Sequence, residues 1–279
     1  MRLARVSGRL SLLTGSGAVD VESASGGRFD TDPDAAFARW DELREWAQNR
    51  PDGEGTPYTD DQLGAPLLRP AQVFAIGLNY RDHAAESGVG VPTTPAVFTK
   101  FRSCLTGPYD TVALPSAGVD WEVELVAVIG RRAERVSEEN AWSHVAGVTV
   151  GQDLSERALQ LAGPVPQFSL GKSYPGFGPV GPWIVTPDEL ADPDDLELSC
   201  SVGEEVLQKG RTRDMVFSVP ELVARLSAVL PLLPGDLIFT GTPPGVGMAR
   251  RPPRFLTPDS TLVSTIEGIG QLRNPLVNG

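Results

Sequence analysis

The sequence predicts an α+β fold that is mainly β, with a mixed and mostly antiparallel sheet. Segments with strand character outnumber helical ones, and the two do not alternate regularly, which disfavours a doubly wound α/β sheet. The 30 glycines and 25 prolines among 279 residues indicate many turns and a site built from loops. A chain of this length has room for one large domain and one small one.

The first part of the chain has two short, partly apolar runs, Leu3–Val6 and Leu10–Thr14, followed by a predicted helix. Asp32 can cap this helix and Pro33 suits its first position. Apolar residues then recur at helical spacing: Phe37, Trp40, Leu43 and Trp46.

The segment Pro51–Arg69 is rich in proline, glycine, aspartate and threonine, which is typical of a linker. We therefore predict a small N-terminal domain with its linker over residues 1–70, and the main domain over residues 71–279. In the main domain the pattern predicts strands and three short helical segments. The strands are Gln72–Gly77, Ala96–Lys100, Thr111–Leu114, Trp121–Gly130, Ala146–Val150, Asp195–Gly203, Glu205–Arg211, Asp236–Thr240 and Thr261–Glu267; the helices are His83–Ser87, Ser155–Leu161 and Val219–Leu230.

Composition and charge exclude several classes of function. A formal net charge of −12 repels phosphate backbones and anionic lipid, so we expect neither a nucleic-acid partner nor a membrane partner. Two cysteines make neither a disulfide framework nor a Cys-x-x-Cys zinc site. Arginines interrupt the apolar start of the chain, and no apolar run is long enough to span a membrane. These features predict a cytoplasmic protein.

The segment from Val119 to Gly130 is the most informative one. In a strand, alternate residues share a face. One face would then be apolar, and Asp120, Glu122 and Glu124 would form a row on the other. A solvated acidic face is the ordinary alternative, but the strand continues into the apolar run Leu125–Ile129. Neighbouring carboxylates raise one another's pKa unless a positive charge lies among them. A divalent cation would serve, and oxygen ligands favour Mg²⁺, Mn²⁺ or Ca²⁺ over zinc.

At this point the chain resembles the fumarylacetoacetate hydrolase family, from about Gln72 to the C-terminus. Several motifs follow one another in the family's order. They are Gly77–Glu86 (GLNYRDHAAE), Asp120–Leu125 (DWEVEL), Gln152–Gln160 (QDLSERALQ), Gly171–Ser173 (GKS), Pro234–Asp236 (PGD) and Thr240–Gly247 (TGTPPGVG).

The resemblance implies metal ligands at Glu122, Glu124 and Asp153. It also implies a β-roll or barrel catalytic domain behind a small N-terminal α/β domain, usually in a homodimer. Within the family, the chain looks like the branch that includes 2,4-diketo-3-deoxy-sugar-acid hydrolases and acylpyruvases. It departs from the family pattern at Gln152, where many members have Asn, at Ala158, where they have Asp, and at Pro175, which replaces an acidic residue.

His83 and Glu86 are three residues apart, so they meet on one face if the segment is helical. A glutamate can orient a histidine that takes a proton from water, and family members resemble this arrangement. An incidental surface pair is the alternative. The second histidine, His144, precedes an apolar strand, and we interpret it as structural.

Other polar residues of these motifs are candidates for substrate contacts. Lys172, beside a glycine, could stabilise an oxyanion. Arg157 and Gln160 could hold a substrate carboxylate or brace Asp153. Thr242 follows a predicted strand, in a loop that lacks the P-loop and Rossmann patterns. Lys100 and Tyr80 are weaker candidates, and Tyr80 with Asn79 could simply shape its loop.

We therefore predict a metal-dependent hydrolase that cleaves a carbon–carbon bond of a 2,4-dioxo acid. The alternatives are a decarboxylase of an oxaloacetate-like 2-oxo acid and an enol or double-bond isomerase on the same scaffold. A non-catalytic metal- or ligand-binding protein is a third possibility, which the combination of His83, Glu86 and Lys172 disfavours.

Overall fold

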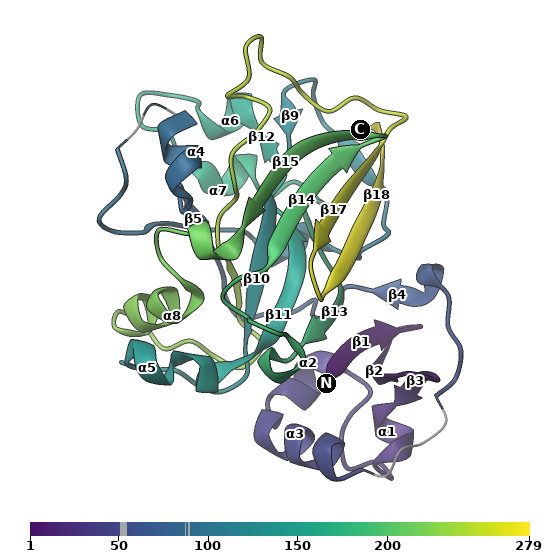
Figure 1. The fold of residues 1–279 in the computed structure, drawn as a ribbon. Helices are drawn as coiled ribbons and strands as arrows, with labels where there is room; N and C mark the ends of the chain where they lie inside the picture. The colour runs from purple at the N-terminus through teal and green to yellow at the C-terminus, as the bar shows by residue number, and fades with distance from the viewer. Residues whose placement is uncertain (51–54, 87, 89) are drawn as a thin grey trace.

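The computed structural model describes residues 1–50, 55–86, 88 and 90–279, and its fold is mainly β, as predicted (Figure 1). The largest sheet runs in the order β3-β2-β1-β13-β11-β10-β16-β5-β6, with β4 on β1 and β7 on β13. Its strands are β1 (Arg2–Val6), β2 (Arg9–Thr14), β3 (Gly17–Asp20), β4 (Leu63–Gly64), β5 (Val73–Gly77), β6 (Ala96–Thr99), β7 (Leu105–Thr106), β10 (Val123–Ile129), β11 (Val145–Gln152), β13 (Gly178–Val185) and β16 (Leu237–Phe239).

Two smaller sheets complete the β structure. The five-stranded sheet runs in the order β15-β14-β17-β18-β8, and a two-stranded sheet pairs β12 with β9. These strands are β8 (Val112–Leu114), β9 (Val119–Asp120), β12 (Ser155–Glu156), β14 (Glu197–Val202), β15 (Glu205–Arg211), β17 (Thr261–Ile266) and β18 (Gly270–Asn278). Most pairs are antiparallel, and the parallel ones are β16–β5, β18–β8 and β13–β7.

The helices are short and lie around the sheets (Figure 1). They are α1 (Val21–Ala24), α2 (Pro33–Phe37), α3 (Trp40–Asn49), α4 (Arg81–Glu86), α5 (Glu138–Ala141), α6 (Arg157–Gln160), α7 (Phe168–Gly171) and α8 (Val219–Ser227). Ser87, the predicted end of the helix that is now α4, lies outside the described residues. None of the helices in the described part of the chain has the length and apolar character to cross a membrane.

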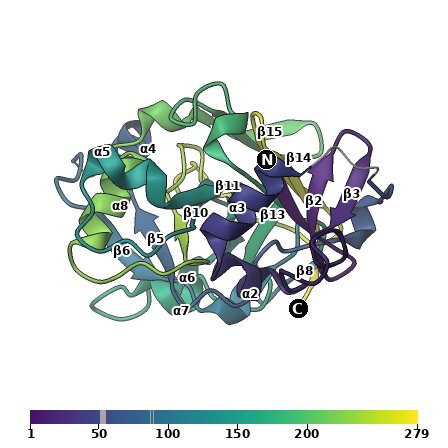
Figure 2. The ribbon, with the colours of Figure 1, turned by 90° about the horizontal axis from the view of Figure 1, so that it is seen from below.

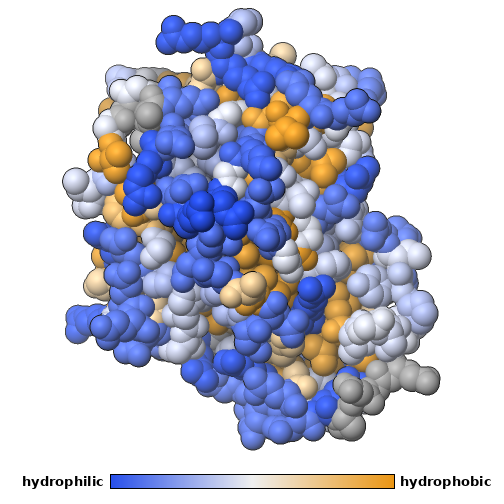
Figure 3. Space-filling view, viewed as in Figure 1, coloured by the Kyte–Doolittle hydropathy of each residue, from blue (hydrophilic) through white to orange (hydrophobic). Residues whose placement is uncertain are grey.

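The core of the molecule is the pair β10 and β11. Every residue of both strands is buried, because the five-stranded sheet, the neighbouring strands and α3 cover them. Trp40 of α3 packs directly on the end of β10, and Figure 2 shows α3 across that end of the sheet. A Cβ at Gly130 would lie 2.7 Å from the Trp40 ring, so this contact requires glycine. The face shown in Figure 3 is mostly hydrophilic, with hydrophobic patches between.

The N-terminal strands extend the main sheet. β1 pairs antiparallel with β13, so residues 1–20 continue the same sheet while forming a lobe beside the main body (Figures 1 and 2). The predicted linker begins at 51–54, outside the described residues. Its later part is ordered on the lobe, because β4 pairs with β1 and Leu63, Ala65 and Leu67 are buried. The domain boundary near residue 70 stays a prediction.

Two predicted elements are each divided in two. The predicted helix after Asp32 is α2 followed by α3, because Arg39 adopts a non-helical backbone conformation with φ −118° and ψ 38°. Asp32 does cap α2, as predicted, by accepting a hydrogen bond from the backbone N–H of Asp34. The segment Val119–Gly130, interpreted as one strand, is β9 followed by β10, with a break at Trp121 and Glu122; the strand predicted over Trp121–Gly130 therefore begins two residues later, at Val123.

The strands β13 and β18 were not predicted, and both contain proline. Proline lacks the N–H that a central strand donates, so its presence argues against such a strand. β13 nevertheless lies between β1 and β11. Its register against β11 shifts between Val148 and Val150, and the Thr149 hydroxyl donates to the carbonyl of Gly181 at 2.9 Å. The irregularity accommodates the prolines.

Asn79 fixes the chain where β5 ends. Its amide donates to the carbonyls of Phe217 and Thr240 at 2.9 and 2.7 Å and accepts from the N–H of Phe217 at 2.8 Å. We predict that Asn79→Ala lowers the free energy of unfolding by roughly 2–4 kcal/mol, because buried backbone groups lose their partners. Urea unfolding measures this loss. The exposed Asn49→Ala serves as the control, with an expected effect within about 0.5 kcal/mol; equal effects of both variants would contradict the prediction.

Candidate metal centre and catalytic site

Three buried carboxylates converge in the core of the main domain. Glu122 lies in the break between β9 and β10, Glu124 in β10, and Asp153 directly after β11. One oxygen from each lies within 4.8 Å of the other two. Their exposed fractions are 8, 1 and 0%, so the acidic row is not a solvated strand face. Three oxygen ligands at this spacing can hold a hard divalent cation.

The break between β9 and β10 turns Glu122 into the site. It releases two backbone N–H groups from strand pairing, and two buried glutamines accept them. The N–H of Glu122 donates to Gln152 Oε1 at 2.9 Å, and that of Val123 donates to Gln208 Oε1 at 3.0 Å. The carbonyl of Glu122 in turn accepts from the N–H of Asp153 at 2.9 Å, which ties two of the three carboxylates together through the backbone.

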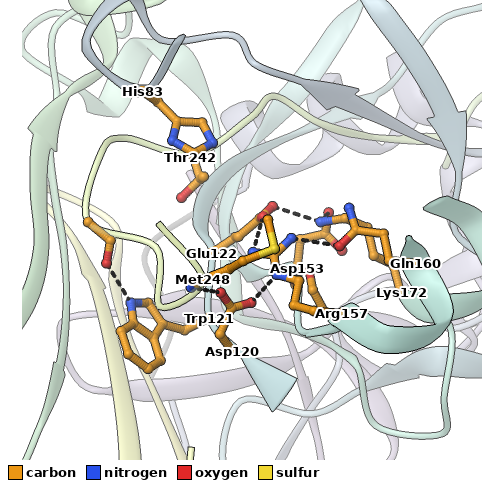
Figure 4. A network of polar contacts seen from close by, with 12 residues as sticks. His83, Asp120, Trp121, Glu122, Asp153, Arg157, Gln160, Lys172, Thr242 and Met248 are labelled. Atoms are coloured by element: carbon orange, nitrogen blue, oxygen red, sulfur yellow. Dashed lines mark hydrogen bonds and ion pairs between the residues drawn. The ribbon is translucent and has the colours of Figure 1, made fainter. Parts of the chain in front are cut away.

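Two buried lysines, Lys100 and Lys172, bind the carboxylates, and Figure 4 shows Lys172 beside them. Lys172 Nζ lies 2.7 Å from both Glu122 Oε2 and Asp153 Oδ2. Lys100 Nζ lies 2.7 Å from Asp153 Oδ1 and donates also to the carbonyls of Lys172 and Phe177. All three protons of the Lys100 ammonium therefore have acceptors, whereas Lys172 keeps one for a further partner.

Arg157, at the start of α6, joins the same network. Its Nη2 donates to Glu122 Oε1 at 2.7 Å, its Nη1 donates to Gln160 Oε1 at 2.7 Å, and its Nε forms an ion pair with Asp120 Oδ1 at 2.6 Å. Asp120 also accepts from the N–H of Met248. Asp120 thus supports Arg157 and the loop after β16.

The charges around the three carboxylates are unequal. Burial would raise the pKa of Glu122, but Lys172 and Arg157 outweigh it and lower this pKa to about 2. For Glu124, burial and the negative charges of Asp153 and Glu122 raise the pKa well above its ordinary value. Among the described residues, Glu124 accepts only the N–H of Gly241, at 2.8 Å. A cation between the three carboxylates would compensate Glu124, so the donor set fits a divalent metal.

A cavity of about 200 Å³ opens beside the carboxylates. Figure 4 shows His83 and Thr242 at this site together with the ion-pair network. The side chain of His83 is 8% exposed, and its Nδ1 lies 3.2 Å from Glu86 Oε2. Glu86 also accepts from the N–H of Gly245. The polar or charged side chains that line the cavity are His83, Glu122, Arg157, Gln160, Lys172 and Thr242.

Three candidates lie elsewhere or have their polar groups occupied. Lys100 does not line this cavity, and its ammonium binds Asp153. Tyr80 is buried outside the cavity, and burial and the charge of Glu124 raise the pKa of its hydroxyl well above the ordinary value. The Thr242 hydroxyl donates to the carbonyl of Val123 and accepts from Gln208, both at 2.8 Å.

The second histidine, His144, lies away from this cavity, and its Nδ1 is 3.0 Å from the carbonyl of Arg132.

A larger hollow of about 590 Å³ lies along β6 and contains none of the three carboxylates. Its lining includes Lys100, whose side chain is nevertheless fully buried and points to Asp153. The chemistry therefore belongs to the smaller cavity.

Sequence reasoning missed the roles of Gln152 and Gln208. Gln152 was noted only as a departure from the family pattern, and Gln208 is 85 residues away from the N–H that it accepts. The acidic residues at the start of the predicted strand are the one sequence signal that could have indicated these glutamines. A strand that begins with buried carboxylates needs polar side chains nearby to accept its backbone N–H groups.

We predict that Gln152→Leu weakens Mn²⁺ binding about ten-fold or more, because the N–H of Glu122 loses its acceptor and the carboxylate loses its fixed direction. Calorimetric titration of the folded variant measures the dissociation constant, with circular dichroism as the check on folding. Gln271→Leu, on an exposed position of β18, is the matched control. An unchanged Mn²⁺ dissociation constant in folded Gln152→Leu would show that the hydrogen bond does not position Glu122.

Comparison with known proteins agrees with this geometry. Residues 72–277 match the family model described as fumarylacetoacetate (FAA) hydrolase C-terminal. The chain is 46% identical over 223 residues to the bovine (Bos taurus) protein named mitochondrial oxaloacetate tautomerase FAHD2A, an alignment that covers 79% of this chain and 71% of the relative.

Solved structures are similar over the whole length. A Mycobacterium smegmatis protein provisionally described as HpcE has a TM-score of 0.97 and 52% identity, with 100% of both chains covered. Maleylpyruvate hydrolase from Sphingobium sp. SYK-6, solved with manganese(II) and pyruvate, has a TM-score of 0.83 and 31% identity, again with 100% of both chains covered. The motifs, the fold and these matches lead to one conclusion: the chain belongs to the fumarylacetoacetate hydrolase family.

Proposed function

We propose that this protein is a divalent-metal-dependent hydrolase that cleaves a carbon–carbon bond of an acylpyruvate-like 2,4-dioxo acid. The observation that carries the proposal is the position of Glu124. One oxygen of this buried carboxylate lies within 4.8 Å of an oxygen from each of the two others, and among the described residues Glu124 has one backbone N–H as its partner. Such a group needs a cation, and a cavity lined by Glu122 and by His83, the partner of Glu86, opens at the site.

Glu122, Glu124 and Asp153 would hold the metal, which we expect to be Mg²⁺ or Mn²⁺, with Ca²⁺ as a further option. When bound, the metal would polarise the 2-oxo group and neutralise the C1 carboxylate of the substrate. The related maleylpyruvate hydrolase was crystallised with manganese and pyruvate, a 2-oxo acid, which supports this ligand class.

His83 is the proposed general base. The Glu86 carboxylate can only accept, so the ring donates its Nδ1 proton to Glu86 and keeps Nε2 free to take a proton from water. The water oxygen bonds to C4 of the dioxo acid, and the C3–C4 bond breaks. Its electron pair stays on C3, which is then protonated to give pyruvate and a carboxylic acid. The free proton of Lys172 can stabilise negative charge that develops on oxygen.

Arg157 and Gln160 contribute in a different way. Arg157 is committed to Asp120 and Glu122, so we assign it to bracing the metal ligand. Gln160 reaches the cavity and could contact the substrate. Lys100 positions Asp153, and Thr242 with Gln208 fixes the loop after β16. Tyr80 shapes the end of β5. A homodimer and a cytoplasmic location remain predictions, and the bovine relative is named as mitochondrial.

The second candidate is keto–enol tautomerisation of oxaloacetate, which the name of the 46% identical relative favours. The same polarised 2-oxo group would acidify C3, and a base such as His83 would move the proton between carbon and oxygen. Decarboxylation uses the same polarisation. Neither route requires an attacking water, so products distinguish them from hydrolysis. A non-catalytic binding protein would turn over no 2-oxo acid.

We predict that Glu124→Gln lowers the affinity for Mn²⁺ on the order of 10–100-fold, because one of three anionic ligands becomes neutral. Calorimetric titration with Mn²⁺ measures the affinity. Glu267→Gln, an exposed glutamate, is the control with an unchanged affinity. If wild-type protein binds no divalent ion, the proposed metal centre is wrong.

We predict that His83→Gln lowers kcat for acetylpyruvate on the order of 10²-fold or more and leaves the Mn²⁺ affinity unchanged, because the general base is lost and the metal ligands are not. The measurement is acetate and pyruvate release with Mg²⁺ or Mn²⁺. Full turnover by the variant would remove His83 from the mechanism. If the wild type leaves acetylpyruvate intact but accelerates enol–keto exchange or carbon dioxide release from oxaloacetate, the second candidate replaces hydrolysis.

A further inference from the structure

The cavity beside the carboxylates is lined by polar and by apolar side chains. The polar ones include Glu122, Lys172 and His83. The rest of its wall is apolar and includes Ile76, Leu78, Phe98, Leu161, Phe168 and Met248. These residues come from the end of β5, from β6, from α7 and the end of α6, and from the loop after β16. The polar side chains suffice to hold a 2-oxo acid, so the apolar side chains are left for the rest of the substrate.

Among the described residues that line the cavity, every basic side chain already has an acidic partner, and the remaining proton of Lys172 is assigned to the oxygen that becomes negative in the proposed reaction. Lys172 binds Glu122 and Asp153, and Arg157 binds Glu122, Asp120 and Gln160. The remaining basic group is His83, which pairs with Glu86. Diverting Arg157 would leave the buried Asp120 without its basic partner, and diverting Lys172 would leave Glu122 and Asp153 with one basic partner each, which is costly.

We propose that the acyl group of the substrate is apolar and uncharged, so that the enzyme selects monocarboxylic 2-oxo acids over dicarboxylic acids of the same length. This inference rests on the proposed function, in which the C1 carboxylate and the 2-oxo oxygen bind at the metal. The distal part of the substrate then lies against the apolar wall. A methyl or alkyl end gains from burial there, whereas a carboxylate loses its hydration without finding a partner.

The test compares two acids that differ at one carbon. 2-Oxoheptanoate ends in a methyl group and 2-oxoheptanedioate ends in a carboxylate, and neither carries the 4-oxo group that hydrolysis requires. Calorimetry on the Mn²⁺-loaded protein measures both dissociation constants without turnover. The expected result is a dissociation constant at least about ten-fold lower for the monocarboxylate.

A matched pair of variants locates the effect in the wall. Leu161 lines the cavity and is 44% exposed, so Leu161→Arg introduces a cation without disturbing the core. Leu159 is 38% exposed and is absent from the cavity lining, so Leu159→Arg adds the same charge outside. Leu161→Arg should lower the monoacid-to-diacid preference about ten-fold, and Leu159→Arg should leave it unchanged.

Each outcome has one meaning. Equal binding of both acids by the wild type, or tighter binding of the diacid, overturns the inference while the proposed function stands. Equal effects of the two arginine variants assign the preference to overall charge and also overturn it. If neither acid binds the Mn²⁺-loaded protein, the proposed function itself fails, and this inference fails with it.

Discussion

The structure depends on a set of carboxylates buried in the centre of the main domain. Among the residues that the structure describes, Asp120, Glu122 and Asp153 form ion pairs with three basic side chains, Lys100, Lys172 and Arg157, and Glu124 forms none. Buried charges are tolerated only when they are paired and hydrogen-bonded, and here one negative charge is left over. Burial and the negative charges of Asp153 and Glu122 raise the pKa of Glu124, whereas Lys172 and Arg157 outweigh burial and lower that of Glu122. A bound cation would compensate this imbalance.

An interruption of strand pairing between β9 and β10 helps to position these carboxylates. A continuous strand from Val119 to Ile129 would pair all of its N–H groups with neighbouring strands. The break at Trp121 and Glu122 leaves two of them to Gln152 and Gln208 instead. Gln208 also donates to Thr242 and to the carbonyl of Pro243, so the same side chain holds the loop after β16 against the start of β10. Ligand and loop are positioned together.

Much of the fold was predictable, because its central strands are long apolar runs. Such runs can be recognised from neighbouring residues in the sequence alone. β10 and β11 are such runs, and the acidic residues ahead of β10 indicated a metal. The central strand β13 could not be found in this way, because its prolines argue against a strand and only its place beside an irregular β11 accommodates them. The break in the acidic strand depends on glutamines 30 and 85 residues away, and such long-range partners leave no local pattern.

Some features of the site were likewise predictable from the sequence, and others were not. The motifs suggested three carboxylates, and the structure brings them together, but a motif does not show which basic group is already occupied. Lys100 was considered for a substrate carboxylate, yet its ammonium is used up by Asp153 and two carbonyls. Glu124 and Asp153 are held by the buried strands β10 and β11, whereas part of the cavity lining comes from the short helices α6 and α7 and from the loop after β16. Loops and short helices can change without disturbing the carboxylates. Relatives with this scaffold are named as a hydrolase and a tautomerase, as expected when function depends on the residues of the site and not on the fold.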